Sequence, residues 1–188
     1  TNITSGIFIG EGAGTGAGGG ASAGIHSNYD IAIGYQAGRM LASGATATYG
    51  NVAMGGDAMG SAVTGNYNVS IGYGAASGAA DVGDHSVSIG YLAGKINTGD
   101  SNVMIGSQAA RDTTGGNNVI IGQGAAASAT TMDASTIIGR QAAGGSIPTG
   151  DYNTILGYQG GYALNGAVEG NVLLGHRAGY GTTSGGYN

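Results

Sequence analysis

The amino-acid sequence predicts an all-β protein, a repetitive parallel β-solenoid or β-roll of about ten coils. Three observations lead to this fold class. An Asn-Val-x-Ile-Gly-x-x-Ala motif recurs ten times in the 188 residues, at intervals of 16 to 24 residues. Each motif contains a short run of β-branched residues with period 2, which is typical of a strand. Glycine supplies 43 residues, and each glycine disfavours helix by about 1 kcal/mol relative to alanine.

The motif extends over the whole chain, so residues 1–188 are predicted to form a single repeat array. Its central glycines are Gly10, Gly34, Gly55, Gly72, Gly90, Gly106, Gly122, Gly139, Gly157 and Gly175. Residues 10–55 contain the two longest intervals and are expected to form long-insertion coils, whereas residues 55–188 form regular coils. Because residues 183–188 resemble the start of another repeat, we expect the chain to be a segment of a longer fibrous protein.

Each motif is predicted to contain a strand, a tight turn and a polar corner. The three residues before the glycine, such as 69–71, form the strand, and the glycine allows the positive φ of a sharp turn. The Asn four residues before the glycine, such as Asn68, is expected to stack as a ladder between coils. Asp30, Ser86 and Ser135 replace this Asn with similar short polar side chains.

The alternation within each strand predicts two faces. The residues one and three before the glycine are apolar in most repeats, so we assign them to the coil interior. The residue between them would then point outward, and after about residue 100 it is large and apolar. We therefore predict an oligomer interface, most simply that of a homotrimer. Its members are Met104, Ile120, Ile137, Ile155 and Leu173.

Composition argues against several functional classes. A net charge of −5 disfavours nucleic acid and anionic membranes as partners, and no apolar run reaches the ~18 residues of a membrane span. No Ser/His/Asp set is defined by spacing. Only one hexapeptide per coil obeys the rule of left-handed β-helix acyltransferases. We expect a protein that is not an enzyme and that binds no cofactor.

The densest polar cluster is Asp-Val-Gly-Asp-His at residues 81–85. Asp81 and Asp84 could ligate a divalent cation, but we interpret the cluster as a solvated insertion loop. The calcium-binding Gly-Gly-x-Gly-x-Asp nonapeptide is absent from the sequence. The sequence therefore predicts no metal site.

Four tyrosines share the position directly after the central glycine: Tyr35, Tyr73, Tyr91 and Tyr158. On an exposed face they would form an aromatic ladder suited to sugar rings, which makes them candidate receptor-binding or glycan-binding residues. In the other interpretation they flank the turn and pack on neighbouring coils. His176 replaces tyrosine at this position and is interpreted as an ordinary repeat residue.

The repeats resemble those of bacteriophage tail fibres, including fibres of marine cyanophages, and more distantly the head repeats of trimeric autotransporter adhesins. The phrases that carry the resemblance are residues 30–38, 68–73 and 153–159. The resemblance implies an elongated, homotrimeric virion appendage that positions host-receptor binding, located on the virion or otherwise extracellular. The alternatives are an adhesin that binds glycan or receptor directly, and a subunit of a self-assembling extracellular filament.

Overall fold

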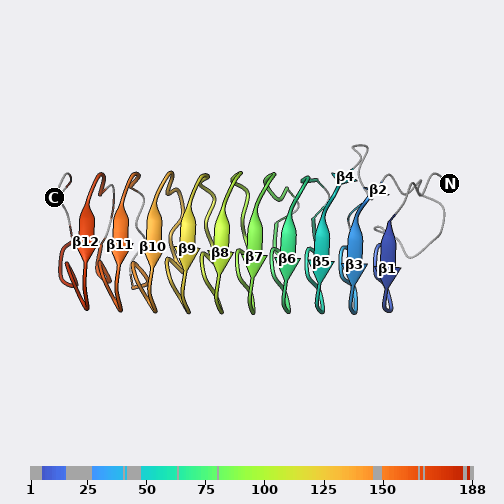
Figure 1. The fold of residues 1–188 in the computed structure, drawn as a ribbon, viewed down its shortest axis with the longest axis horizontal. Coiled ribbons are helices and arrows are strands. Elements are labelled where there is room, and N and C mark those ends of the chain that lie inside the picture. The colour runs from blue at the N-terminus through green and yellow to red at the C-terminus, as the bar shows by residue number, and fades with distance from the viewer. Residues whose placement is uncertain are drawn as a thin grey trace.

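The computed structural model describes residues 6–15, 27–39, 41, 48–62, 64–79, 81–145, 150–164, 166, 168–183 and 186. In these residues the chain is all-β, without a helix, and forms a parallel β-solenoid, which confirms the predicted fold class. Figure 1 shows the strands side by side in one row, from β1 at one end of a rod to β12 at the other.

Ten short strands, one for each repeat, form a single sheet. They are β1 (Ile7–Ile9), β3 (Ile31–Ile33), β5 (Val52–Met54), β6 (Val69–Ile71), β7 (Val87–Ile89), β8 (Val103–Ile105), β9 (Val119–Ile121), β10 (Thr136–Ile138), β11 (Thr154–Leu156) and β12 (Val172–Leu174). Every pair is parallel and aligns equivalent repeat positions, as Val69 with Val87 and Ile71 with Ile89. The strands β2 (Ser27–Asn28) and β4 (Thr48–Tyr49) pair separately.

The insertions predicted within residues 10–55 fall partly on residues 16–26, 40 and 42–47, which lie outside the described residues. The pairing of β1 with β3 and of β3 with β5 nevertheless keeps the repeat register across both long intervals. Insertion in one arc of the coil therefore leaves the strand arc unchanged.

The central glycines turn the chain at the end of each strand, and they have a second role. Their φ angles lie between 125° and 146°, as the predicted sharp turn requires. A Cβ added to Gly55 would lie 2.8 Å from the carbonyl oxygen of Gly72 in the next coil. The coils therefore approach too closely at this turn for any side chain. The following alanines, such as Ala109 and Ala125, are fully buried beside it.

A ladder of buried polar side chains connects successive coils, as the repeated Asn predicted. The backbone N–H of Asn68 donates to Oδ1 of Asn51 at 3.0 Å, and that of Ser86 donates to Oδ1 of Asn68 at 2.8 Å. The same bond repeats without interruption through Asp30, Asn51, Asn68, Ser86, Asn102, Asn118, Ser135, Asn153 and Asn171.

The asparagine side-chain amides also bond to the part of each coil that leads back to the next ladder residue, which we call the returning segment. Nδ2 of Asn118 donates to the carbonyl oxygen of Met132 at 2.5 Å, and Nδ2 of Asn153 donates to that of Val168 at 2.6 Å. Each of these side chains thus bonds to the next coil through its oxygen and to the returning segment through its nitrogen. An aliphatic residue could supply neither bond.

The core contradicts the sequence-based assignment of the strand faces. The middle residue of each strand points into the coil: Met104, Ile120 and Ile137 are fully buried within the single chain, and Ile155 is 1% exposed. Leu173 in β12 is partly buried and packs against the same cluster. These five residues are therefore core residues, and their assignment to an oligomer interface is wrong.

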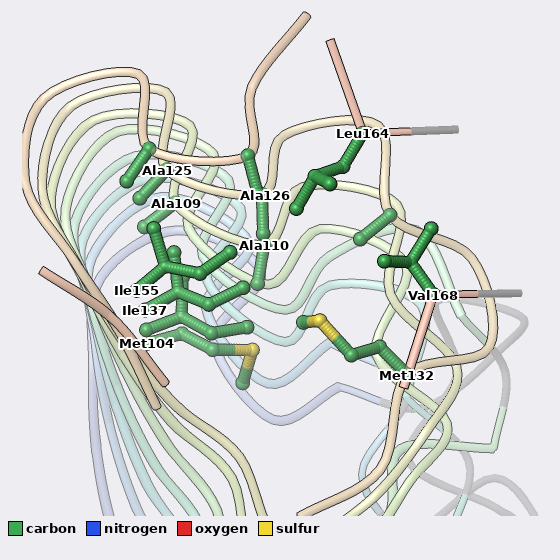
Figure 2. Close-up of a cluster of buried hydrophobic side chains, with 14 residues drawn as sticks. Met104, Ala109, Ala110, Ala125, Ala126, Met132, Ile137, Ile155, Leu164 and Val168 are labelled. Atoms are coloured by element: carbon green, nitrogen blue, oxygen red, sulfur yellow. The ribbon is translucent and has the colours of Figure 1, made fainter. Parts of the chain in front are cut away.

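The position of the buried ladder residue explains why the middle residue of each strand, and not its neighbours, points into the coil. The ladder residue lies two positions before the middle of the strand, so both point to the same face, and the ladder residue is inside. Figure 2 shows the strand residues in one column, beside columns of alanine and opposite side chains from the returning segment, namely Met132, Leu164 and Val168.

The interior contains two hydrophobic clusters rather than one. The first extends from Phe8 to Val82, and the second from Met104 to Leu173. The middle strand residue is Ser70 in the last coil of the first cluster and Ser88 in the coil between the two clusters, and both are buried. The change from small to large middle residues noted in the sequence is thus a change in how the interior is filled.

The only carboxylate in the ladder, Asp30, gives the fold a predicted pH dependence. Burial raises the pKa of the Asp30 carboxyl above its ordinary value of 3.8, although hydrogen bonds from Thr48 and Asn51 act in the opposite direction. A raised pKa in the folded state means that stability is greatest below 3.8 and is lost as pH rises through the folded pKa.

We therefore expect Asp30→Asn to be more stable than the wild type at pH 7, because an amide fills the position without a buried charge. The difference in unfolding midpoint should shrink as pH falls from 7 through the raised pKa of the folded state, and should be smallest below 3.8, where the carboxyl is protonated in both states. Thermal denaturation from pH 3 to 7 measures this. Asp100→Asn, which removes an exposed carboxylate, is the control, and a difference that does not change with pH would contradict the account.

Candidate functional site

The outward side of the ten-stranded sheet, which we call the outer sheet face, has an unusual composition. It consists of the first and third residue of each of the ten strands. All of these are Val, Ile, Leu or Met except Thr136 and Thr154, and none is charged. They are half-buried by their neighbours in the central strands and more exposed at the ends, where Leu174 is 70% exposed. Sequence reasoning placed these side chains inside the coil.

The four candidate tyrosines lie on the turn after the strand and are exposed. The structure brings only Tyr73 and Tyr91 together, with stacked rings whose centroids are 5.9 Å apart. Gly56 occupies the equivalent position between Tyr35 and Tyr73, and three non-aromatic residues separate Tyr91 from Tyr158. The tyrosines therefore form a short stack and two separate rings rather than one continuous ladder.

Tyr158 belongs to a second aromatic group near the end of the rod. Its ring stacks on His176 at 5.3 Å, and the guanidinium of Arg140 lies 5.7 Å from the ring centroid on the other coil. Tyr162 stacks on Tyr180 at 5.2 Å. These contacts join neighbouring coils, as the packing interpretation of the tyrosines predicts.

A second line of aromatic residues was missed by sequence reasoning. Tyr29, Tyr67 and Tyr152 lie five residues before the central glycine, have φ of 57° to 63°, and are 58% to 69% exposed. His85 holds the same position and stacks on Tyr67 at 5.3 Å. The recurrence of Tyr directly before the ladder position was the sequence signal that identifies them.

The acidic cluster at 81–85 bonds to the preceding coil. The Asp81 carboxylate accepts from the hydroxyl of Thr64, and Oδ1 of Asp84 accepts from the backbone N–H of Asn66 at 2.7 Å. Asp100 and Asp151 repeat the Asp84 contact in later coils. In the part of the chain that the structure describes, no group of three or more His, Asp or Glu side chains gathers as a metal site.

These acidic contacts form a second ladder, which runs in the opposite sense to the first. Here the carboxylate of one coil accepts from the coil before it, whereas the Asn ladder accepts from the coil after it. The two ladders lie two residues apart and fix both sides of the same corner. The carboxylates thus have a structural explanation within the chain.

The chain matches no protein-family model, and neither curated proteins nor solved structures give a significant match to it. No helix long and apolar enough to cross a membrane occurs among the described residues.

Proposed function

We propose that this chain is a structural segment of a bacteriophage tail fibre, assembled from identical chains, which positions host-receptor binding. In this proposal the protein belongs to the virion. It acts mechanically: it is a rod that transmits position and force between the particle and the part of the fibre that meets the host. It performs no chemical step and needs no cofactor.

The observation that supports the proposal is the unbroken connection between coils. Ten strands pair in register along the rod, and the Asn ladder connects the coils from β3 to β12 at the adjoining corner. At about 4.8 Å per strand the sheet is about 48 Å long. Bending such a rod requires breaking hydrogen bonds in several coils together, so the architecture favours stiffness. The motif phrases at 30–38 and 153–159 support the assignment to a phage fibre.

Immunogold electron microscopy tests the proposal. Antibodies raised against the folded chain should label thin fibres that project from phage particles in lysates of the source microorganism. Pre-immune serum is the control. Label on the cell envelope, with none on virions, would contradict the proposal and favour an adhesin. Label on free filaments would contradict it in favour of a self-assembling filament.

The second candidate function is direct binding of a glycan or receptor, and the exposed Tyr73–Tyr91 stack is the observation that favours it. Aromatic side chains of this kind offer apolar ring faces to sugars.

If the chain is only a structural rod, the Tyr73→Ala/Tyr91→Ala variant should attach to host cells as strongly as the wild type. Tyr35→Ala, which removes a tyrosine outside the stack, is the matched control. Attachment by flow cytometry is the measurement. A loss of attachment of about tenfold or more in the double variant, but not in the control, would establish the binding function and contradict a purely structural role.

A further inference from the structure

Among the described residues, nothing covers the outer sheet face, although it is apolar from β1 to β12. A soluble sheet with one solvated side normally alternates apolar residues inside with polar residues outside. Here both sides of the strands are apolar, as in strands that are covered on both faces. We propose that a second copy of this chain covers the outer sheet face, so that the two sheets pack face to face.

The size of the face fits this occupant. Ten strands at about 4.8 Å and three residues at about 3.3 Å give a plane of about 480 Å². This area lies within the range of about 300–600 Å² that the largest apolar patch of a typical monomer covers, and such patches are often functional. Two such faces together would remove about 1,000 Å² from water, which is the lower limit of a specific protein interface. Contacts from flanking residues would add to this area.

The period of the face also favours a second copy over an unrelated partner. Its aliphatic rows repeat with the strand spacing, and equivalent positions align in every pair, as Val103 with Val119 and Ile105 with Ile121. Only a surface with the same spacing can match these rows over the whole length. A second copy has this spacing by construction, whereas a helix or a globular domain would match a few rows at most.

The border of the face permits close approach. The column directly after the third strand residue consists of the central glycines, such as Gly106 and Gly122, which have no side chain to stand between two sheets. The residue before the first strand position is the buried ladder residue, which points into the coil. Neither border places a charged side chain beside the apolar rows.

This inference rests on the proposed function in that a fibre is assembled from identical chains, but it names a different surface from the one that the sequence suggested. Its failure is distinguishable from that of the fibre proposal. Immunogold labelling reports where the protein is located, whereas the test below reports only whether the outer sheet face joins two chains.

Light scattering after size-exclusion chromatography tests the proposal on the whole 188-residue chain. The wild type should elute as a multiple of 18.0 kDa. Val103→Asp/Val119→Asp places two carboxylates on the face and should weaken self-association by about a hundredfold or more. Val103→Thr/Val119→Thr is the matched control, because Thr already occupies the same column at 136 and 154, and it should stay associated. A monomeric wild type, or an associated Asp variant, would overturn the proposal.

Cysteine crosslinking keeps the proposal testable even if the Asp variant fails to fold. The chain has no cysteine, so a single introduced cysteine can be crosslinked only to the same cysteine of another chain. Facing sheets lie about 10 Å apart, which is too far for a disulfide, so a bis-maleimide about 10 Å long is the reagent. Ile105→Cys, on the outer sheet face, should form covalent dimers with this reagent. Gln123→Cys, on the turn, is the matched control and should not. Absence of crosslinking at Ile105, or equal crosslinking at both positions, would overturn the proposal.

Discussion

Hydrogen bonds between successive coils at the buried Asn corner are the constraint on which this architecture depends. At the corner the chain changes direction, and the N–H of each ladder residue finds its acceptor on a side chain of the preceding coil, such as Oδ1 of Asn102 for Asn118. An unpartnered N–H buried there would cost about 1–3 kcal/mol in each coil. Charge pairs contribute little, since charged residues are 8% of the chain and Arg111–Asp112 is the one ion pair within the described residues.

The corner also decides which side chains enter the core. Because the ladder residue is inside, the alternation of a strand places the middle residue inside and its two neighbours outside. Because of this alternation, Met104 and Ile137 are buried, whereas Val103 and Ile138 lie on the outer sheet face. The apolar outer face is therefore a consequence of the same alternation that forms the core, and it is the face that the proposed second copy would cover.

The repeat made most of the fold predictable from sequence. Motif spacing located all ten strands, and the recurring Asn and Gly predicted the ladder and the positive-φ turn that the structure contains. The faces were assigned wrongly because hydrophobicity was used alone: Val and Ile occur in nearly every repeat beside the glycine, whereas the true core position is Ala or Ser at residues such as Ala53 and Ser70. Counting in steps of two from the buried Asn would have assigned the strand faces correctly.

The stacking of Tyr67 on His85 and the second acidic ladder depend on how coils align, which becomes visible only when equivalent positions are compared across repeats.

The most direct test of the central claim compares Asn118→Ala with Asn118→Ser. Alanine leaves both the N–H of Ser135 and the carbonyl of Met132 without their partners, whereas serine keeps an acceptor of the kind that Ser86 presents to Asn102. The account predicts that Asn118→Ala lowers the free energy of unfolding by about 2–5 kcal/mol and accelerates hydrogen exchange at the Ser135 amide. Asn118→Ser should lose clearly less and keep that amide protected. Equal stability of the two variants, or an unchanged exchange rate at Ser135 in Asn118→Ala, would contradict the role assigned to the Asn ladder.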